Sequence, residues 1–427
     1  MNISAIHNLF LKCSSVSIDT RKIELNSMFV AIKGERFDAN TFAKEALDRG
    51  ASYVIIDNDS YYIDERTIIV EDSLIALQEL SKFHRLYLNL PIVALTGSNG
   101  KTTTKELIQV VLARKFKTKA TVGNFNNHIG VPLTLLSFTK ETEIGIVEMG
   151  ANHQKEIAFL CELAMPNFGY ITNFGKAHLE GFGGIEGVIR GKSEMYQYLN
   201  KANGLTFVNL EDPIQVDKSM GLRSFSFGIQ KKCADITIAS VNANPFVEIV
   251  FDDVVIKSNM IGLYNANNLN AALAIGKYFK VADLAIKEAL EGYVPENNRS
   301  QLLTKGSSQI ILDAYNANPS SMAVAIANFV QLDGGNKVMV LGDMFELGEE
   351  SLQEHKAIVE SAVITNDVKC YFVGEAFFRN KIEKSNFEFY QNFECFAAAF
   401  KELKFENSML LIKGSRGMAL ERTLEFL

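Results

Sequence analysis

The feature of this sequence that most constrains its fold is residues 94–104, which read Ala-Leu-Thr-Gly-Ser-Asn-Gly-Lys-Thr-Thr-Thr. The apolar run 92–95 predicts a buried strand, and the pattern of 105–112 predicts a helix. A tight loop between a strand and a helix start turns backbone N–H groups and the positive helix end towards an anion. Lys101 would supply a cation to the outer phosphates, and the Thr102 hydroxyl could bind Mg²⁺. We therefore predict a phosphate-binding loop that consists of Gly97, Ser98, Asn99, Gly100, Lys101, Thr102 and Thr103.

Composition limits the classes of protein to which the chain can belong. Its 427 residues suffice for about two to four domains, and 47% hydrophobic with 22% charged residues is ordinary for a globular enzyme. The net charge of −7 and the lack of Lys/Arg-rich runs argue against a nucleic-acid partner. Scattered cysteines without a C-x-x-C pair fit free thiols in a reducing compartment. Because no signal peptide or long apolar run is seen, we expect a cytoplasmic protein without membrane contact.

Predicted elements alternate between strands and helices and divide the chain into three α/β units, at residues 1–83, 84–299 and 300–427. The first is a small α/β unit, the second a mostly parallel, doubly wound sheet around the phosphate loop, and the third a Rossmann-like sheet. Short apolar runs predict strands at 28–32, 53–56, 92–95, 144–149, 169–172, 310–312, 338–341, 370–373 and 409–412. Helical patterns lie at 42–49, 74–88, 105–112, 188–199, 266–279 and 283–290.

One segment of the second unit is expected to depart from this parallel arrangement, and one motif is absent from the third unit. Between 224 and 262, alternating stretches such as 235–238 and 247–251 predict an antiparallel patch. The third unit lacks a G-x-G-x-x-G motif after its first strand, so dinucleotide binding is not indicated there.

Three polar residues of the second unit could act together with the phosphate loop. Glu148 ends the strand 144–149, where open α/β sheets place their ligands, and a carboxylate there is a natural Mg²⁺ ligand. His178 follows the strand 169–172 in a polar loop, so metal contact and a structural role stay equally open. Lys192 lies in a helical pattern, and a solvated charge is the favoured interpretation on these grounds alone.

Three further residues suit contacts with a nucleotide. Asn268 belongs to an asparagine cluster at a helix start, so it could cap the helix or hydrogen-bond a purine edge. Arg299 ends the second unit beside Asn297 and could bridge domains through a phosphate, with a surface position as the equal alternative. Asp313 ends a buried strand and could accept hydrogen bonds from ribose hydroxyls.

The third unit carries charged loops after two of its strands. Asp343 and Glu346 follow the strand 338–341, and the segment 413–416, which ends in Arg416, follows the last strand. Acidic and basic loops in one domain suit a zwitterionic substrate, although the acids could instead cap helices.

Together these segments resemble the Mur ligase superfamily over nearly the whole chain. The segments that resemble superfamily landmarks are 96–103, 148–150, 177–180, 265–268 and 297–299. The segments 315–319, 341–348 and 413–416 resemble the branch that adds D-alanyl-D-alanine to UDP-N-acetylmuramoyl-tripeptide. In the first unit, 19–21 and 29–35 resemble the UDP-sugar-binding domain.

The resemblance implies an ATP-dependent amide ligase with an acyl phosphate intermediate and two Mg²⁺ ions. Residues 97–103 would hold the ATP phosphates, Thr102 and Glu148 would share one metal ion, and His178 would bind the second. Lys192 would be the lysine that family members carry as a carbamate, which is a bidentate metal-binding anion. Lys101, His178 and Lys192 would form the catalytic set.

The resemblance also assigns the remaining contacts. Asn268, Arg299 and Asp313 would contact adenine, phosphate and ribose, respectively. The substrates would be UDP-N-acetylmuramoyl-tripeptide and D-alanyl-D-alanine, and the enzyme would be a monomer. The residues that would bind the substrates are Thr20, Arg21, Asn316, Asp343, Glu346 and Arg416. The chain departs from the family at Leu312, where an acid is frequent, and at 38–40, where Asp-Gly-His is common. The second departure puts details of the nucleotide-sugar contacts in doubt.

Two other interpretations stay open. A folylpolyglutamate-type enzyme is another ligase of the superfamily, although the loops 341–348 and 413–416 and the separate first unit argue against it. A P-loop regulatory ATPase belongs to a different class, although it would need neither two substrate domains nor a second metal set. The sequence does not decide whether the third residue of the tripeptide is diaminopimelate or lysine.

Overall fold

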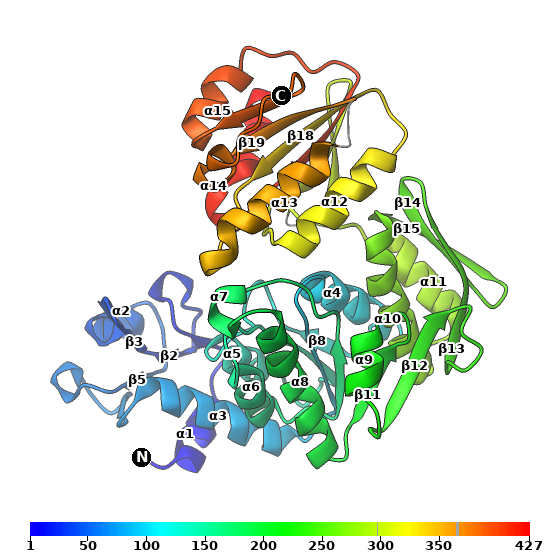
Figure 1. Cartoon of the computed structure of the whole chain (residues 1–427). Helices are drawn as coiled ribbons and strands as arrows, with labels where there is room; N and C mark the ends of the chain where they lie inside the picture. The colour runs from blue at the N-terminus through cyan, green and yellow to red at the C-terminus, as the bar shows by residue number, and fades with distance from the viewer. Residues whose placement is uncertain (297, 364–366) are drawn as a thin grey trace.

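The computed structural model describes residues 1–296, 298–363 and 367–427, so Asn297 of the predicted landmark lies outside the described residues. The described chain forms sheets of four, nine and six strands and one two-stranded hairpin. Figure 1 shows the third unit above the central unit and the first unit to one side. The predicted α/β class with mostly parallel sheets is confirmed.

The four-stranded sheet of the first unit is parallel throughout, in the order β1-β2-β5-β6. Its strands are β1 Val16–Ser17, β2 Met28–Val30, β5 Tyr53–Ile56 and β6 Thr67–Ile69, with the hairpin β3 Lys33–Gly34 and β4 Phe37–Asp38. Its helices are α1 Ile3–Phe10, α2 Ala43–Asp48 and α3 Ser73–Leu88. Buried residues of α3 pack with α1 and with α5 (Gly130–Leu136) of the central unit. α3 therefore continues across the predicted boundary at 83/84 and joins the two units.

The nine-stranded central sheet has the order β15-β14-β13-β12-β11-β10-β7-β9-β8. Its strands are β7 Ile92–Thr96, β8 Thr118–Ala120, β9 Ile144–Glu148, β10 Phe168–Ile171, β11 Leu205–Asn209, β12 Ser224–Ile229, β13 Ile236–Ala243, β14 Phe246–Phe251 and β15 Val254–Ile261. The strands from β8 to β13 pair in parallel, and β13, β14 and β15 pair antiparallel. The predicted antiparallel patch is thus confirmed for β13–β15, whereas β12 continues the parallel part of the same sheet.

Helices cover both faces of the central sheet. They are α4 Lys101–Leu112, α5 Gly130–Leu136, α6 Glu156–Ala164, α7 Leu179–Phe182, α8 Ile185–Lys201, α9 Pro213–Lys218, α10 Ala266–Tyr278 and α11 Asp283–Gly292. One hydrophobic core contains the buried residues of α4, α10 and α11, and another contains those of α5, α6 and α8. This double layer explains why the central parallel strands read as continuous apolar runs.

The third unit has a six-stranded sheet in the order β16-β17-β21-β18-β19-β20. Its strands are β16 Gln301–Lys305, β17 Ser308–Asp313, β18 Asn336–Gly342, β19 Val368–Val373, β20 Phe387–Tyr390 and β21 Ser408–Lys413. Its helices are α12 Pro319–Gln331, α13 Ser351–Val363, α14 Glu375–Arg379 and α15 Phe393–Phe400. The edge strands β16 and β20 were not predicted, and β16 pairs antiparallel with β17. The other strand pairs of this sheet are parallel, as expected.

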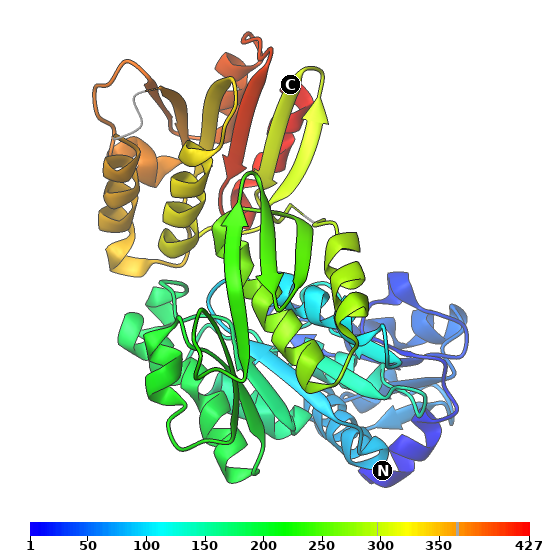
Figure 2. The ribbon, with the colours of Figure 1, turned by 90° about the vertical axis from the view of Figure 1, so that its right-hand side faces the viewer.

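Short 3₁₀ turns complete the described chain: η1 Thr20–Lys22, η2 Ala39–Phe42, η3 Asp59–Tyr61, η4 Leu263–Asn265, η5 Gly348–Glu350, η6 Arg416–Met418 and η7 Leu420–Phe426. The turn between β13 and β14 reaches the third unit, where Asn244 Nδ2 donates to Asp333 Oδ2 at 3.1 Å (Figure 2). Among the described helices, none combines the length and hydropathy that a membrane crossing requires.

Candidate active site

The predicted phosphate loop connects β7 to α4, and its backbone requires glycine at two positions. Gly97 and Gly100 have positive φ values of 146° and 76°. A Cβ atom on Gly97 would lie 1.9 Å from Thr172 Oγ1, and one on Gly100 would lie 2.6 Å from Asn268 Oδ1. A larger residue at either position would therefore push the loop away from the neighbours that hold it.

Lys101 opens α4 and folds back over its own loop. Its Nζ donates to the carbonyl oxygen of Gly97 at 2.7 Å and lies 3.4 Å from that of Ser98. Burial lowers the pKa of the Lys101 ammonium, and the nearby charge of Glu148 opposes this shift. A phosphate group would offer this ammonium a charge-assisted hydrogen bond in place of neutral carbonyl acceptors.

A cavity of about 910 Å³ lies between the central and third units, beside the phosphate loop. The carboxyl ends of β7, β9, β17 and β21 all border it, which is where open α/β sheets bind ligands. The predicted site residues that line it are Ser98, Asn99, Gly100, Lys101, Thr102, Thr103, Glu148, His178, Asn268, Arg299, Asp313, Asn316 and Glu346.

Glu148 has the chemistry expected of a metal ligand. Parallel pairing of β9 with β7 places it beside Leu95, at the base of the phosphate loop. Its Oε1 accepts from Asn126 Nδ2 at 2.8 Å, whereas its Oε2 is buried without a hydrogen-bond partner in the described chain. A buried carboxylate oxygen without a donor is stabilised by a cation, so Glu148 fits Mg²⁺. Among the described residues there is no cluster of three or more His, Cys, Asp or Glu suited to a metal. The other predicted metal ligands therefore stay predictions.

Lys192 is fully buried in α8, so the sequence-based interpretation as a solvated charge is wrong. Its Nζ has no hydrogen-bond partner in the described chain and lies 5.3 Å from the centre of the Phe182 ring. Burial, followed by the charge of Lys101, holds the pKa of Lys192 well below its usual value. A lowered pKa favours the uncharged, nucleophilic form of an amine, which fits the predicted carbamate. Lys192 does not itself line the cavity.

His178 and Glu346 meet across the interface between the central and third units. His178 Nδ1 is hydrogen-bonded to Glu346 Oε2, and this hydrogen bond lowers the pKa of Glu346. Both residues have left-handed backbones, with φ values of 53° and 61°. Such strain clusters at functional sites, because the surrounding structure must hold it in place. The pairing gives Glu346 an observed partner in the central unit, whereas its predicted contact with the dipeptide stays a prediction.

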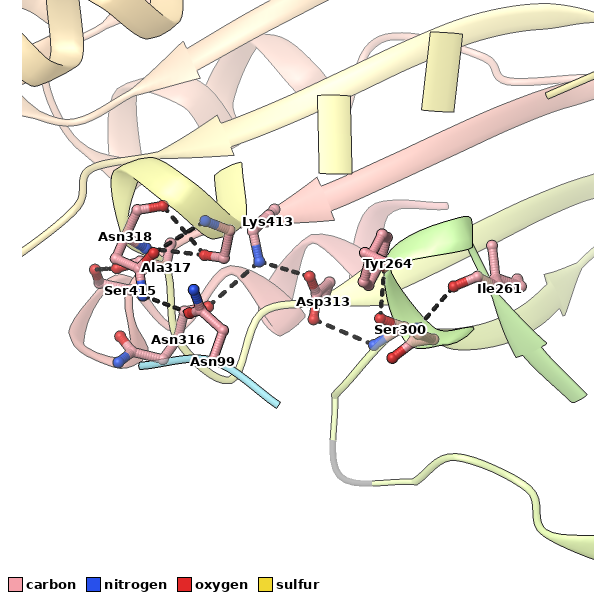
Figure 3. A network of polar contacts seen from close by, with 12 residues as sticks. Asn99, Ile261, Tyr264, Ser300, Asp313, Asn316, Ala317, Asn318, Lys413 and Ser415 are labelled. Atoms are coloured by element: carbon pink, nitrogen blue, oxygen red, sulfur yellow. Dashed lines mark hydrogen bonds and ion pairs between the residues drawn. The ribbon is translucent and has the colours of Figure 1, made fainter. Parts of the chain in front are cut away.

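Asp313 lies in a buried polar network at the cavity wall (Figure 3). Parallel pairing of β17 with β21 sets Asp313 opposite Lys413, and Lys413 Nζ donates to Asp313 Oδ2 at 2.5 Å. The other carboxylate oxygen accepts from the Ser300 N–H at 3.2 Å, and the Ser300 hydroxyl lies 2.8 Å from that of Tyr264. This network joins the third sheet to the segment that leaves the central unit.

Arg299 stacks on an aromatic ring of the third unit. Its guanidinium carbon lies 3.6 Å from the centre of the Tyr315 ring, and its Nε is buried without a hydrogen-bond partner in the described chain. A cation stacked in this way is fixed in orientation but keeps donors for an anion. Asn268, in contrast, already accepts from Thr104 Oγ1 at 3.0 Å and donates to Asn265 Oδ1 at 2.9 Å.

Comparison with known proteins identifies the family of this chain. The model of the Mur ligase middle domain matches residues 95–276, and that of the Mur ligase, glutamate ligase domain, matches residues 298–416. Relatives from Bacillus subtilis (strain 168) and Escherichia coli (strain K12), both named UDP-N-acetylmuramoyl-tripeptide--D-alanyl-D-alanine ligase, are 35% and 33% identical. They align with 96% and 97% of this chain and over 92% and 93% of their own lengths. The chain belongs to the Mur ligase family.

Solved structures agree with this assignment to the Mur ligase family. MurF from Acinetobacter baumannii superimposes with a TM-score of 0.85 at 28% identity and covers 99% of this chain and 98% of that protein. MurF ligase from Thermotoga maritima, solved in complex with ADP, gives a TM-score of 0.84 at 27% identity, with 98% and 97% covered. The three units of this Mur ligase thus have the arrangement of experimentally solved relatives.

Several predicted site residues of this Mur ligase lie outside the cavity. Asp343 accepts the backbone N–H groups of Ala376 and Phe377 at 2.9 and 3.0 Å, so it caps α14, as the alternative interpretation expected. Arg416 is exposed and pairs with Glu421. In the first unit, Thr20 and Arg21 form η1, and Arg21 is exposed and pairs with Asp19. The proposed substrate contacts of these residues stay predictions.

Four residues that the structure places at the site were not among the predicted site residues, although two of them lie in the predicted segments 315–319 and 413–416. Lys413 is a buried strand-end cation, and Asn126, Asn173 and Asn318 supply side-chain amides to Glu148 and to the phosphate loop. Asn318 precedes Pro319, a typical helix start, so the sequence identifies it as a cap but not as a partner of the loop. Lys413 and Asn173 lie at or just after strand ends, a position that many non-functional residues share, whereas Asn126 lies further along the loop after β8 and has no such signal.

Proposed function

We propose that this chain joins D-alanyl-D-alanine to UDP-N-acetylmuramoyl-tripeptide with the energy of ATP hydrolysis, in the synthesis of peptidoglycan precursors. One observation carries the proposal: the phosphate loop of the central unit and the charged strand ends of the third unit border a single cavity. Activation of a carboxylate and capture of an amine require such a shared space. The names and structures of the relatives support the same reaction.

In the first step, a carboxylate oxygen of the tripeptide attacks the γ-phosphorus of ATP. The bond from that phosphorus to the bridging oxygen breaks, so ADP and an acyl phosphate form. The loop N–H groups and Lys101 stabilise the charge on the phosphoryl oxygens. Arg299, stacked on Tyr315, has a buried donor that suits a phosphate oxygen. Asp313 would accept from the ribose hydroxyls.

In the second step, the free amine of the dipeptide attacks the acyl carbon. The C–N bond forms, phosphate leaves with the acyl C–O electron pair, and the amine loses a proton. The third unit contributes Asn316 and Glu346 to the cavity in which this step would occur. Approach of the two substrates within one enclosed space lowers the entropic cost of their reaction.

Magnesium would bind to Thr102, Glu148, His178 and the carbamate of Lys192, and it would neutralise phosphate charge when bound. The unpartnered oxygen of Glu148 and the buried, unpartnered amine of Lys192 support this assignment. Carbamate formation joins the Lys192 nitrogen to the carbon of CO₂ with loss of one proton. A ¹³C resonance that appears with ¹³C-bicarbonate and is missing in Lys192→Gln would identify the carbamate.

The test of the proposed function is release of phosphate from ATP by the purified protein, with Mg²⁺ and bicarbonate present. We expect release only when both UDP-N-acetylmuramoyl-tripeptide and D-alanyl-D-alanine are supplied, with one amide product per phosphate. No release with both substrates would contradict the proposal. Because the reaction uses ATP and a UDP-linked sugar, we propose a cytoplasmic location. A monomeric state without nucleic-acid or membrane partners remains a prediction from the sequence.

A further inference from the structure

Within the described part of the chain, the third unit is hydrogen-bonded directly to the phosphate loop through one side-chain amide. Asn318 Nδ2 donates to Asn99 Oδ1 at 2.6 Å, and Figure 3 shows the two side chains meeting beside the buried network. Among the described residues, this is the one hydrogen bond that links loop 97–103 to the third unit. The direct hydrogen bond from the third unit thus reaches the loop at Asn99, whereas an indirect route runs from Ser320 Oγ through the Gly175–Lys176 peptide to Ser98 Oγ.

The backbone of Asn99 is held by the central unit itself. Its N–H donates to Asn173 Oδ1 at 3.0 Å. Its carbonyl oxygen accepts from Thr172 Oγ1 at 2.6 Å and from Asn173 Nδ2 at 3.0 Å. The side chain of Asn99 is consequently available to the third unit, and a change in its position acts on a residue at the centre of the loop.

Asn318 is rigid before it makes this contact. It is the N-cap of α12, where its Oδ1 accepts from the Ser321 N–H at 2.9 Å and its own N–H donates to Ser321 Oγ at 3.1 Å. This capping box fixes the plane of the amide. The Nδ2 donor is therefore held in place by local structure, and only the position of the third unit decides whether it reaches Asn99.

Neighbouring contacts seat α12 and α13 on the same part of the central unit. The Lys176 N–H donates to Ser320 Oγ at 2.8 Å, and Lys176 Nζ donates to Glu354 Oε1 at 2.5 Å. These contacts place the start of α12 next to the loop that follows β10. The bond between Asn318 and Asn99 thus belongs to a docked arrangement of the two units.

We propose that Asn318 is a positioning residue that fixes the phosphate loop, through the side chain of Asn99, when the third unit is docked. The inference rests on the proposed function, because it assigns the contact to the phosphoryl-transfer step. Binding of ATP phosphates uses the loop N–H groups and Lys101, which remain without Asn318. Loss of the contact should consequently lower kcat more than it raises KM for ATP.

The main variant is Asn318→Ser, because serine caps helices about as well as asparagine but cannot reach Asn99. The matched control is Asn392→Ser, which changes the cap of α15 in the same unit, where Asn392 Oδ1 accepts from the Cys395 N–H at 2.9 Å. Asn392 does not line the cavity. In Asn318→Ser we expect kcat to fall about three- to tenfold, the effect of one hydrogen bond, with KM for ATP changed less than about twofold. Asn392→Ser should change neither.

Hydrogen exchange of the full chain gives a readout that does not require ligase activity. The amides of Ser98 and Asn99 are bonded to Asn173, so their exchange reports opening of the loop. Exchange should accelerate about three- to tenfold in Asn318→Ser but not in Asn392→Ser. If the wild type shows no ligation, the proposed function fails, whereas this exchange measurement still decides the role of Asn318.

A second variant and a double-mutant cycle distinguish loss of the direct contact between Asn318 and Asn99 from a general destabilisation of the third unit. Asn318→Asp keeps the cap and removes the donor, so it should also accelerate exchange. The effects of Asn99→Ala and Asn318→Ser should be strongly non-additive, because each removes the same bond. Additive effects, unchanged exchange in Asn318→Ser, or a rise in KM for ATP at unchanged kcat would overturn the proposal.

Discussion

The central and third sheets direct strand ends at the same cavity, but the charged groups near these ends differ in whether the protein itself supplies their partners. In the central unit, Glu148 Oε2 and Lys192 Nζ have no hydrogen-bond partner within the described chain. In the third unit, Asp313 is paired with Lys413, and Asp343 caps α14. Because an unpartnered buried polar group costs about 1–3 kcal/mol, we expect ligands to complete the central site. In the third unit, the strand-end carboxylates Asp313 and Asp343 are instead already satisfied by protein groups.

The largest effect that tests this comparison is expected when one member of a buried ion pair is removed from the third unit. Lys413 is 2% exposed and Asp313 is 17% exposed, so Lys413→Met leaves a buried carboxylate without its cation. We expect the free energy of unfolding to fall by about 3 to 5 kcal/mol. Urea unfolding followed by far-UV circular dichroism measures this, since the chain has no tryptophan.

Lys369→Met is the matched control for this loss, because it removes a lysine from an ion pair in the same sheet. Lys369 and Glu388 lie 2.6 Å apart but are 32% and 41% exposed. Solvent screens such a pair, so the loss should be below about 1 kcal/mol. Equal effects of the two substitutions would contradict the view that the Asp313–Lys413 pair belongs to a buried polar network.

The next largest effect is expected in the central unit, on turnover rather than on stability. Lys101→Ala removes the loop cation that would stabilise the phosphoryl group, so kcat should fall on the order of 100-fold or more. Lys117→Ala, at an exposed position shortly after α4, should leave kcat unchanged. Initial rates of phosphate release at saturating substrates measure both. Near-normal turnover of Lys101→Ala would exclude the phosphate-loop assignment.

A smaller effect is expected where the two units meet, at Glu346. Glu346→Gln keeps a hydrogen-bond acceptor for His178 but removes the charge that favours the pair, so we expect kcat to fall about tenfold. Glu349→Gln, which removes a neighbouring acid in η5, is the control and should have no effect. Steady-state kinetics at a fixed pH measures both variants. Unchanged turnover of Glu346→Gln would show that His178 needs no orientation from the third unit.

The same comparison explains how much of the fold could be read from the sequence. Strands such as β7 and β18 are covered on both faces, so they appear as continuous apolar runs and were predicted. The edge strands β16 and β20 lie at the margins of the third sheet and are only partly buried, so their patterns are weaker. Predictions succeeded where burial leaves a pattern in the local sequence.

The candidate site shows the corresponding limit. Lys101 and Glu148 follow apolar strands, and their positions alone indicated a phosphate and metal site. The burial of Lys192 depends on how α8 packs against its neighbours, and the sequence alone favoured a surface charge. The contact between Asn318 and Asn99 joins residues 219 positions apart in the chain. Such pairs depend on the docking of whole units, which no local pattern contains.

The junction of the first and central units offers the mildest test, because its buried polar pair is satisfied without ligands. His84 Nε2 donates to the Phe138 carbonyl at 2.9 Å, so its Nδ1 is free to accept from His7 Nε2 at 3.0 Å. This arrangement satisfies the paired nitrogens with both rings uncharged. Burial, with a smaller effect of His84, lowers the pKa of His7 to about 4, and burial also lowers the pKa of His84.

The sign of the resulting pH dependence follows from these depressed pKa values. Below pH 6.5 the unfolded chain takes up protons that the folded protein does not, so stability is lost as the pH falls from about 6.5 towards 4. Between pH 7 and 6 the loss should be below about 1 kcal/mol for each histidine. In urea unfolding at several pH values, the free energy of unfolding should depend less steeply on pH for His7→Phe than for the wild type. The control is His153→Gln, which changes a ring that is 64% exposed and should match the wild type. If the free energy of unfolding of His7→Phe depends on pH as steeply as that of the wild type, this junction, unlike the central site, is insensitive to the charge of its buried groups.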